Sequence, residues 1–456
     1  MPRELRLNAF AMNTVGHQSQ GLWRHPDDKS ADYRSIDHWV DLARVLERGK
    51  FDGLFLADVL GVYDVYGDGV DTALQEAVQV PVNDPLLIIP SMAQATEHLS
   101  FAATVNLSHE APLPFARRMS TLDHLTDGRL GWNIVTGYLD SGAKGAGKNT
   151  QVSHDTRYDI AEEFMDVQYS FWEGSWQSDA VCRDRETGVF ADPAKVHLVE
   201  HDGEYFSVSG IHLAEPSPQR TPVLYQAGAS SQGIAFAAKH AECVFVGGRS
   251  RKKMAVDVAK IRALAADAGR DPRDILVFAL VTIITGATDD EAQQKHDDYR
   301  QYVSVPGALA LVSGWTGVDF SKPELVAASA ADSNAIKSAA AAFSGSVSDE
   351  ASARSIGASV GLGGGGPVLV GGPARIADEL ASWAEETDLD GFNLAYAVMP
   401  QTFEDVVDHV VPELQRRGMF KREYQPGTYR EKLFGQGPLL GQRHPGAGYR
   451  RSTRTP

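Results

Sequence analysis

Cysteine is scarce in this chain of 456 residues, which contains only Cys182 and Cys243. Two isolated thiols exclude a disulfide framework and a cysteine-rich metal cluster, so we expect no metal site. Long apolar runs are missing too. No stretch of about 18 apolar residues could span a membrane. The N-terminal sequence MPRELRLNAF also lacks the apolar core of a signal peptide.

Positive charge is scarce relative to negative charge. The chain has 43 lysines and arginines against 60 aspartates and glutamates, a net charge of −17. A nucleic-acid-binding surface needs an excess of basic groups, so we expect no nucleic-acid partner. This balance suits a soluble protein of the cytoplasm. The hydrophobic share of 43% and the charged share of 23% are typical of a globular fold.

Strand and helix patterns alternate along most of the chain. Eight short segments rich in β-branched, aromatic and apolar residues predict strands. They are residues 5–12, 53–57, 101–105, 130–136, 222–226, 243–246, 275–284 and 391–396. Helical patterns follow most of them, and together they predict a (β/α)8 TIM-like barrel. A doubly wound open sheet is the alternative, but it needs a glycine-rich turn after the first strand, where this chain reads AMNTVGHQSQ.

We expect one barrel domain across residues 1–456, with two interruptions and a tail. Residues 176–221 are rich in Asp, Glu, Gly and Pro and predict an insertion of loops and hairpin strands. Residues 303–366 form a second insertion, rich in Ala, Ser and Gly. It ends in the run GLGGGG, which we interpret as a flexible linker rather than a phosphate loop because the GK[ST] ending is absent. The tail, residues 420–456, is polar and irregular in pattern.

A helix predicted to begin near His154 is a candidate anion site. His154 and Tyr158 are four residues apart and so share one side of the helix. Free N–H groups at a helix N-terminus favour a phosphate. A capped surface helix with a chance His–Tyr pair explains the same spacing, so both interpretations stay open.

A second candidate anion site follows the fifth predicted strand, in the sequence QAGASSQG. Small residues such as Gly228 let backbone N–H groups approach a phosphate, and Ser230 and Ser231 add hydroxyls at the start of a helix. An ordinary capped loop is the alternative. We favour the phosphate interpretation because strand ends are where barrel enzymes bind ligands.

Seven motifs together resemble one family, the bacterial-luciferase-like, two-component flavin monooxygenases. They are WRHP (23–26), LERGKFDGLFLADV (46–59), STLDHLTDGRLGWNIVT (120–136), HDTRYDIAEEF (154–164), FADPAKVH (190–197), PVLYQAGASSQG (222–233) and DGFNL (390–394). The subgroup includes nitrilotriacetate monooxygenase, dibenzothiophene sulfone monooxygenase and pristinamycin IIA synthase. LNAFAMNTVGH, the segment 55–85 and GTYREKLFG resemble long-chain alkane monooxygenase in particular.

The resemblance implies a luciferase-like barrel that binds FMN and occurs as a homodimer or homotetramer. It also implies that a separate flavin reductase supplies reduced FMN. Oxygen would then form a flavin C4a-peroxide that oxygenates a small organic substrate, either alkane-like or containing a heteroatom. Two rival functions are a deazaflavin-dependent oxidoreductase on a related barrel and a non-catalytic flavin-binding relative.

The resemblance also implies the flavin-binding residues. Tyr158, Ser230 and Ser231, with His154 nearby, would hold the phosphate. The ring and ribityl chain would lie against the residues that end the second, third and fourth predicted strands, namely Asp58, Thr104, Thr136 and Gly137.

Four polar residues are the candidates for positioning the substrate or moving a proton. His17 follows the first strand and can titrate near neutrality. Tyr138 follows the fourth strand, and Tyr63 and Gln79 lie on a long loop of the kind that forms lids. Three positions depart from the alkane enzyme's pattern, which has a cysteine at Thr14, a histidine at Tyr138 and another histidine near Leu311. We therefore expect the oxygenating function to be retained and leave the substrate open.

Overall fold

The computed structural model describes residues 3–228, 230–322, 336, 339 and 349–451. Eight parallel strands pair in the order in which they occur along the chain, and pairing between the sixth and seventh closes the sheet. The barrel strands are β1 (Arg6–Met12), β2 (Gly53–Ala57), β3 (Ser100–Asn106), β4 (Leu130–Val135), β9 (Val223–Gln226), β10 (Cys243–Val246), β11 (Leu276–Ile284) and β13 (Gly391–Ala395). The predicted (β/α)8 barrel is confirmed, and the open sheet is excluded because β10 pairs with β11.

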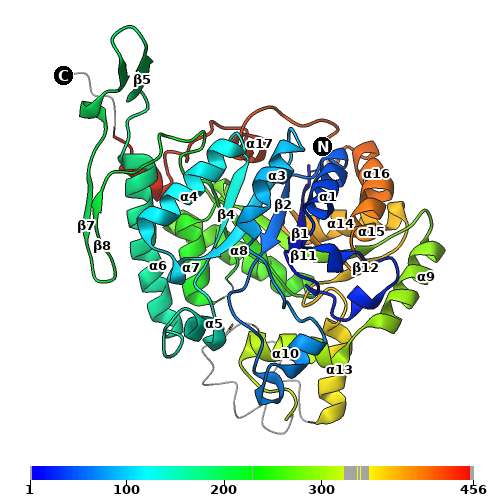
Figure 1. Cartoon of the computed structure of the whole chain (residues 1–456). Coiled ribbons are helices and arrows are strands. Elements are labelled where there is room, and N and C mark those ends of the chain that lie inside the picture. Colours follow the sequence, from blue (N-terminus) through cyan, green and yellow to red (C-terminus); the bar gives the residue numbers. More distant parts are fainter. Residues whose placement is uncertain (1–2, 229, 323–335, 337–338, 340–348, 452–456) are drawn as a thin grey trace.

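Helices cover the outside of the barrel (Figure 1). They are α1 (Ile36–Arg48), α3 (Ile89–Gln94), α4 (Pro112–Leu125), α6 (His154–Tyr169), α7 (Ser231–His240), α8 (Arg251–Asp267), α9 (Asp289–Tyr299), α14 (Pro373–Thr387), α15 (Gln401–Asp405) and α16 (Val411–Arg416). The pattern at 83–98 predicts one helix, but the structure has a 3₁₀ turn (Pro85–Leu87) and the short α3. Pro90 lies in the first turn of α3, where its missing N–H costs little, and it could not continue a helix from the preceding turn. No helix in the described parts is long and apolar enough to cross a bilayer.

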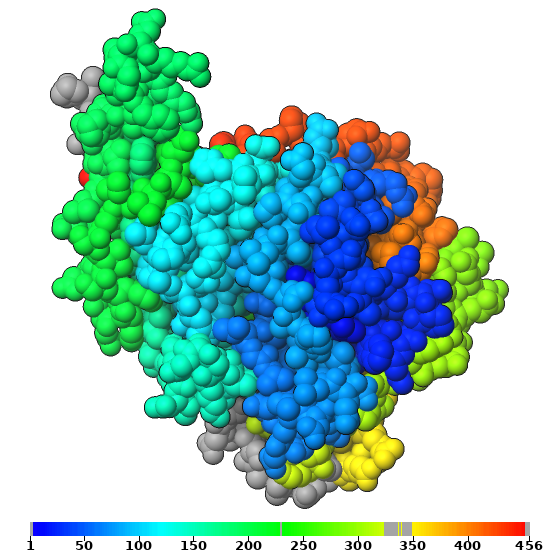
Figure 2. Space-filling view, viewed as in Figure 1, coloured from blue at the N-terminus to red at the C-terminus, as the bar shows by residue number. Residues whose placement is uncertain are grey.

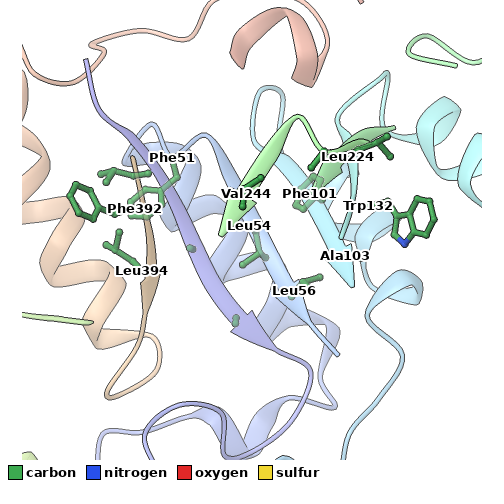
Figure 3. Packing of buried hydrophobic residues seen from close by; sticks show 14 of the residues in the cluster. Phe51, Leu54, Leu56, Phe101, Ala103, Trp132, Leu224, Val244, Phe392 and Leu394 are labelled. Atoms are coloured by element: carbon green, nitrogen blue, oxygen red, sulfur yellow. The ribbon is translucent and has the colours of Figure 1, made fainter. Parts of the chain in front are cut away.

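The core lies between the barrel and the helices. Alternate residues of each strand form it, because successive side chains of a strand point to opposite faces of the sheet. Leu54 and Leu56 of β2 belong to this outer layer, whereas Phe55 between them belongs to a separate cluster inside the barrel. β3 repeats the alternation, with Phe101 outside and Ala102 inside. Figure 3 shows side chains of the outer layer on neighbouring strands. The polar side chains that this alternation directs inward are therefore available to a site within the barrel.

The first insertion forms two hairpins that project from the barrel. They consist of β5 (Val181–Asp184) with β6 (Val189–Ala191), and β7 (Val199–Asp202) with β8 (Ser207–Gly210). In Figures 1 and 2 the β5–β6 hairpin of this arm stands away from the rest of the molecule, whereas the β7–β8 hairpin lies along α6. The β7–β8 hairpin is held on α6, where the Phe206 ring lies 5.5 Å from that of Phe164 and the backbone N–H groups of Tyr205 and Phe206 donate to the Glu163 carboxylate.

The second insertion includes α10 (Val305–Thr316) and α13 (Glu350–Val360), which pack together. The GLGGGG run after α13 differs from the expected flexible linker. Gly363 and Gly364 have positive φ and lie against the side chains of Thr282 and Gln18, and most of the run is buried. It is a tight packed turn that leads into β12 (Val368–Val370), a short strand paired with the end of β11.

The tail, expected to be irregular, contains α17 (Tyr429–Phe434) and a 3₁₀ turn (Pro445–Tyr449). Tyr429 is buried in the cluster inside the barrel and hydrogen-bonds Tyr225 of β9. Arg430 is buried in an ion pair with Glu242, with 2.6 Å between Nε and Oε1. These contacts seal the N-terminal end of the barrel, and local sequence patterns do not reveal them because their partners are about 200 residues away.

Candidate functional site

The carboxyl ends of β3 and β4 bring several predicted ligand-binding residues together. Thr104 pairs in register with Asn133, whose side-chain nitrogen donates to the Thr104 hydroxyl at 3.0 Å. The next residues of β4 lead directly into Thr136 and Gly137. This end of the sheet therefore presents hydroxyl and amide groups toward the barrel axis.

Gly137 is held in place by its neighbours. Its φ is +70°, and a Cβ atom there would lie 2.4 Å from the Asn106 side-chain nitrogen, so the position requires glycine. The Gly137 carbonyl accepts a hydrogen bond from buried Arg157 of α6. The Thr136 carbonyl accepts one from the Ser108 hydroxyl at 2.9 Å. The loop is therefore fixed to α6, the helix that carries His154 and Tyr158.

The two candidate anion sites lie together, between the N-terminal ends of α6 and α7. The hydroxyl of Tyr158 lies beside the side chains of Ser230 and Gln226 and interacts with both. It also lies against the backbone at the start of α7, because a Cβ added to Gly228 or Gly233 would be only 3.0 or 2.7 Å from it. Ser230 caps α7 by accepting from the Gly233 N–H at 3.0 Å.

His154 and Ser231 occupy the edges of this cluster. The His154 ring lies 5.3 Å from the Tyr158 ring and contacts the Asp155 carboxylate at 2.7 Å. Ser231, by contrast, is exposed, and its hydroxyl donates to the Gln232 side chain at 2.8 Å. In this structure the Ser231 side chain therefore points away from the Tyr158 cluster, while Ser230 points into it.

Asp58 lies just beyond β2 and is half-buried. Burial, with a smaller contribution from the neighbouring carboxylate of Asp84, raises its pKa to about 7, although a hydrogen bond from the Val59 backbone opposes the shift. Asp58 can therefore hold or release a proton near neutral pH.

The four candidate catalytic residues are linked by hydrogen bonds. The Tyr63 hydroxyl contacts the Gln79 side-chain oxygen at 2.9 Å and the Tyr138 hydroxyl at 2.6 Å. The Gln79 side-chain nitrogen donates to the His17 carbonyl at 3.2 Å. Residues from the ends of β1 and β4 and from the long loop after β2 thus form one network.

Burial determines the protonation states in this network. It lowers the pKa of His17 to about 3, so the imidazole is neutral at physiological pH. It also raises the pKa of Tyr138 to about 12, even though a hydrogen bond with Tyr63 opposes the shift. Within the described residues, Nδ1 of His17 has no hydrogen-bond partner. The network is therefore uncharged and has one ring nitrogen available to a ligand.

The three departures from the alkane-enzyme pattern do not lie in one place. Leu311 of α10 is buried in the same apolar cluster as Tyr63, and Tyr138 packs against that cluster. Thr14 is buried separately, where its hydroxyl donates to the Pro81 carbonyl at 2.7 Å. Leu311 and Tyr138 therefore belong to one apolar cluster, and Thr14 supports the loop that carries Gln79.

Sequence reasoning missed several residues that this geometry identifies. Arg157 fixes the Gly137 loop, Gln226 lies beside Tyr158, and Trp315 packs against the cluster that contains Tyr63. The residue type gave one usable signal, since a buried arginine needs acceptors. The partners themselves come from distant segments, and no spacing rule joins them.

Comparison with known proteins identifies the family to which this chain belongs. Residues 12–390 match the family described as luciferase-like monooxygenase. Long-chain alkane monooxygenase of Geobacillus thermodenitrificans (strain NG80-2) is 48% identical over 442 residues, which cover 96% of this chain and 96% of the relative. Dimethyl-sulfide monooxygenase of Hyphomicrobium sulfonivorans is 46% identical over 454 residues, with 99% and 94% covered.

A solved structure adds a flavin-containing neighbour. Riboflavin lyase, described with modified FMN and the substrate riboflavin, superposes with a TM-score of 0.93 at 35% identity, and the match covers 99% of this chain and 100% of the other. The similarity therefore extends over the whole barrel and its insertions.

Proposed function

Because this chain belongs to the luciferase-like monooxygenase family, we propose that it uses reduced FMN and O2 to oxygenate a small organic substrate. One oxygen atom would enter the substrate and the other would leave as water. The observation that carries the cofactor assignment is the cluster of Tyr158, Ser230 and Gly228 between the N-termini of α6 and α7. Its hydroxyl groups and backbone N–H groups suit a single phosphate.

The described residues fit FMN at both ends of the molecule. Tyr158, Ser230 and Gly228 would hold the phosphate, with His154 and Ser231 at its edge. Asp58, Thr104, Thr136 and Gly137 would contact the ring and ribityl chain. Gln226 Oε1 and Asn133 Oδ1 are buried and have no partner among the described residues, so each can take a hydrogen bond from a ligand.

Bound reduced flavin would supply the two electrons that O2 activation requires. The chain's own part is to exclude water, orient the substrate and manage a proton. Gln18 Nε2 lies 3.4 Å from His17 Nε2 and can only donate, so the His17 proton sits on Nδ1 and can be offered to a ligand. Tyr63, Leu311 and their apolar neighbours would keep water from the reacting atoms.

A separate flavin reductase is the expected partner, and the chain is expected to assemble as a homodimer or homotetramer. A cytoplasmic location stays a prediction from charge. The names of the two relatives indicate substrates as different as a long-chain alkane and dimethyl sulfide. The oxygenating function is therefore proposed for a small organic molecule without naming one.

The test couples the purified protein to an FMN reductase and NADH and measures product and hydrogen peroxide together. FMN should bind more tightly than FAD, because the cluster accommodates one phosphate. Oxygen uptake should give oxygenated product with candidate alkanes or sulfides. Binding of FAD as tight as FMN would refute the cofactor assignment. Hydride transfer to a deazaflavin without oxygen consumption would refute the monooxygenase proposal.

The same assay tests the catalytic assignments. Loss of a group that takes part in proton transfer should reduce product formation by roughly 10²- to 10⁴-fold. We expect a higher ratio of hydrogen peroxide to product in His17→Ala, Tyr63→Phe and Tyr138→Phe, with FMN affinity almost unchanged. Wild-type rates and ratios in all three variants would show that these residues have no catalytic role.

A further inference from the structure

The hydrogen-bond network around Tyr138 has a fixed direction. Gln79 lies between the His17 carbonyl, which can only accept, and the Tyr63 hydroxyl. Its nitrogen must therefore face His17, and its oxygen must face Tyr63. Because an amide oxygen only accepts, Tyr63 uses its single proton in the bond to Gln79.

The other two contacts of Tyr63 follow from that assignment. With its proton given to Gln79, Tyr63 can only accept from Tyr138 across their 2.6 Å contact. Trp315 packs against the same cluster, and its indole N–H, which can only donate, favours the same arrangement at Tyr63. Tyr63 then donates to Gln79 and accepts from Tyr138. Tyr138 is left with its proton directed at Tyr63.

Tyr138 therefore presents only acceptor capacity to whatever lies beyond it. The bond to Tyr63 is the one hydrogen bond that its side chain makes within the described residues. Its side chain is half-buried and follows β4 at the carboxyl end of the barrel, next to Gly137. A ligand at this end of the barrel can reach it.

The surroundings of Tyr138 are apolar. The cluster against which it packs includes Tyr63, Leu139, Ala310 and Leu311. In the parts of the chain that the structure describes, no charged side chain hydrogen-bonds Tyr63, Gln79 or Tyr138. Such a wall favours an uncharged ligand, because a buried charge without a partner is costly.

We infer that Tyr138 determines substrate specificity as a hydrogen-bond acceptor, and that Gln79, acting through Tyr63, is the positioning residue that makes it so. The preferred substrate is then a small uncharged molecule with an apolar body and one O–H or N–H group. This inference rests on the proposed function, since it assumes that the substrate lies at the same end of the barrel as the flavin.

The experiment compares cyclohexanol, which can donate, with cyclohexanone, which can only accept. Dissociation constants are measured by ligand-observed NMR on the FMN-loaded protein without oxygen. Wild type should bind the alcohol about 2- to 10-fold more tightly, the value of one hydrogen bond. In Tyr63→Phe and in Gln79→Leu, Tyr138 regains a proton to donate. The ketone should bind more tightly there than it does to wild type, and the ratio should fall to about one.

Two further variants separate this effect from general disruption. Trp315→Phe alters the packing around Tyr63 without changing the direction of the network, so the alcohol preference should persist. Tyr138→Phe should abolish the preference without any gain for the ketone. Equal affinities in wild type, no measurable binding of either ligand, or loss of preference in Trp315→Phe equal to that in Tyr63→Phe would each overturn the inference.

An FMN titration of the same samples reports separately on the cofactor. If FMN fails to bind but the alcohol preference and its response to the variants are seen, the proposed function is wrong while the network acts as inferred. If FMN binds normally and the two ligands bind equally, the proposed function stands and this inference alone is refuted.

Discussion

Adjacent serines at the start of α7 have different surroundings. The Ser230 hydroxyl points toward Tyr158 and caps the helix, whereas the exposed Ser231 hydroxyl turns to Gln232. Sequence patterns do not distinguish the two serines, because both are small and polar and lie at the start of a helix. Their orientation in the loop decides which one can contact a phosphate.

Ser230→Ala should therefore weaken FMN binding by about 10- to 150-fold, the value of one hydrogen bond to a charged group. Ser231→Ala is the matched control and should change the dissociation constant much less. Fluorescence titration of FMN with each variant gives both values. Equal losses of FMN affinity in the two variants would contradict the orientation of the serines. Unchanged affinity in Ser230→Ala would show that the phosphate binds elsewhere.

Asp58 should make the stability of the protein depend on pH. Its pKa of about 7 in the folded protein lies well above that of an exposed aspartate, near 3.9. The folded state therefore holds this proton more tightly, and the contribution to stability is lost as pH rises from about 4 to about 7. Urea unfolding should show wild type losing more stability than Asp58→Asn between pH 5 and pH 8.

Asp84→Asn provides the control for that experiment. Removal of the neighbouring carboxylate should lower the pKa of Asp58, since the repulsion from Asp84 contributes to its rise. The pH range over which stability is lost should then shift downward. An Asp58→Asn variant whose pH dependence matches wild type would show that this carboxyl does not titrate near neutrality.

At the scale of elements, α17 seals the N-terminal end of the barrel although it is not one of the helices of the (β/α)8 repeat. Arg430 donates to the carbonyls of Thr221 and Pro222 and pairs with Glu242. The side chains of Arg430 and Glu242 are 3% and 6% exposed, so water solvates neither charge appreciably and each depends on the other. A helix of six residues is therefore held by its buried contacts rather than by its own propensity.

Arg430→Gln should destabilise the protein by about 3–5 kcal/mol, because Glu242 is left as a buried charge without a partner. Arg354→Gln is the control, since that arginine pairs with Glu350 on the surface and should cost at most about 1 kcal/mol. Equilibrium urea unfolding measures both. The double variant Arg430→Gln/Glu242→Gln should recover part of the loss, and a failure to recover any would mean that packing, not charge, holds α17.

At the scale of the whole molecule, exposed apolar side chains concentrate on the projecting arm. Val189, Phe190, Leu198, Ile211 and Leu213 lie on it or at its base and are 40–60% exposed. The β5–β6 end of the arm, which carries Val189 and Phe190, stands clear of the barrel (Figure 2). A second copy of this chain would cover such a surface, in keeping with the homodimer or homotetramer expected for the family.

The double variant Val189→Ser/Phe190→Ser should therefore shift the protein toward a smaller assembly in sedimentation velocity. Val256→Ser, which removes an exposed apolar side chain from α8, should leave the assembly unchanged. A wild-type monomer at micromolar concentration, or a double variant that sediments like wild type, would exclude the arm as the subunit contact.

Local sequence patterns determined much of this protein. The apolar periodicity placed all eight barrel strands to within a few residues. The spacing of His154 and Tyr158 put both on one side of α6, and Ser230 was identified as a residue at a helix start. These features depend on neighbours a few residues apart, which is the range over which propensity and capping act.

Only the tertiary structure decided the features that join distant segments. Closure of the sheet through β10 and β11, the α17 seal and the orientation of Ser230 toward Tyr158 all depend on how the elements pack. The direction of the chain from Gln79 through Tyr63 to Tyr138 depends on which donor meets which acceptor in space. The sequence identified those three residues as candidates. Which of them donates and which accepts is defined only when the side chains are in contact.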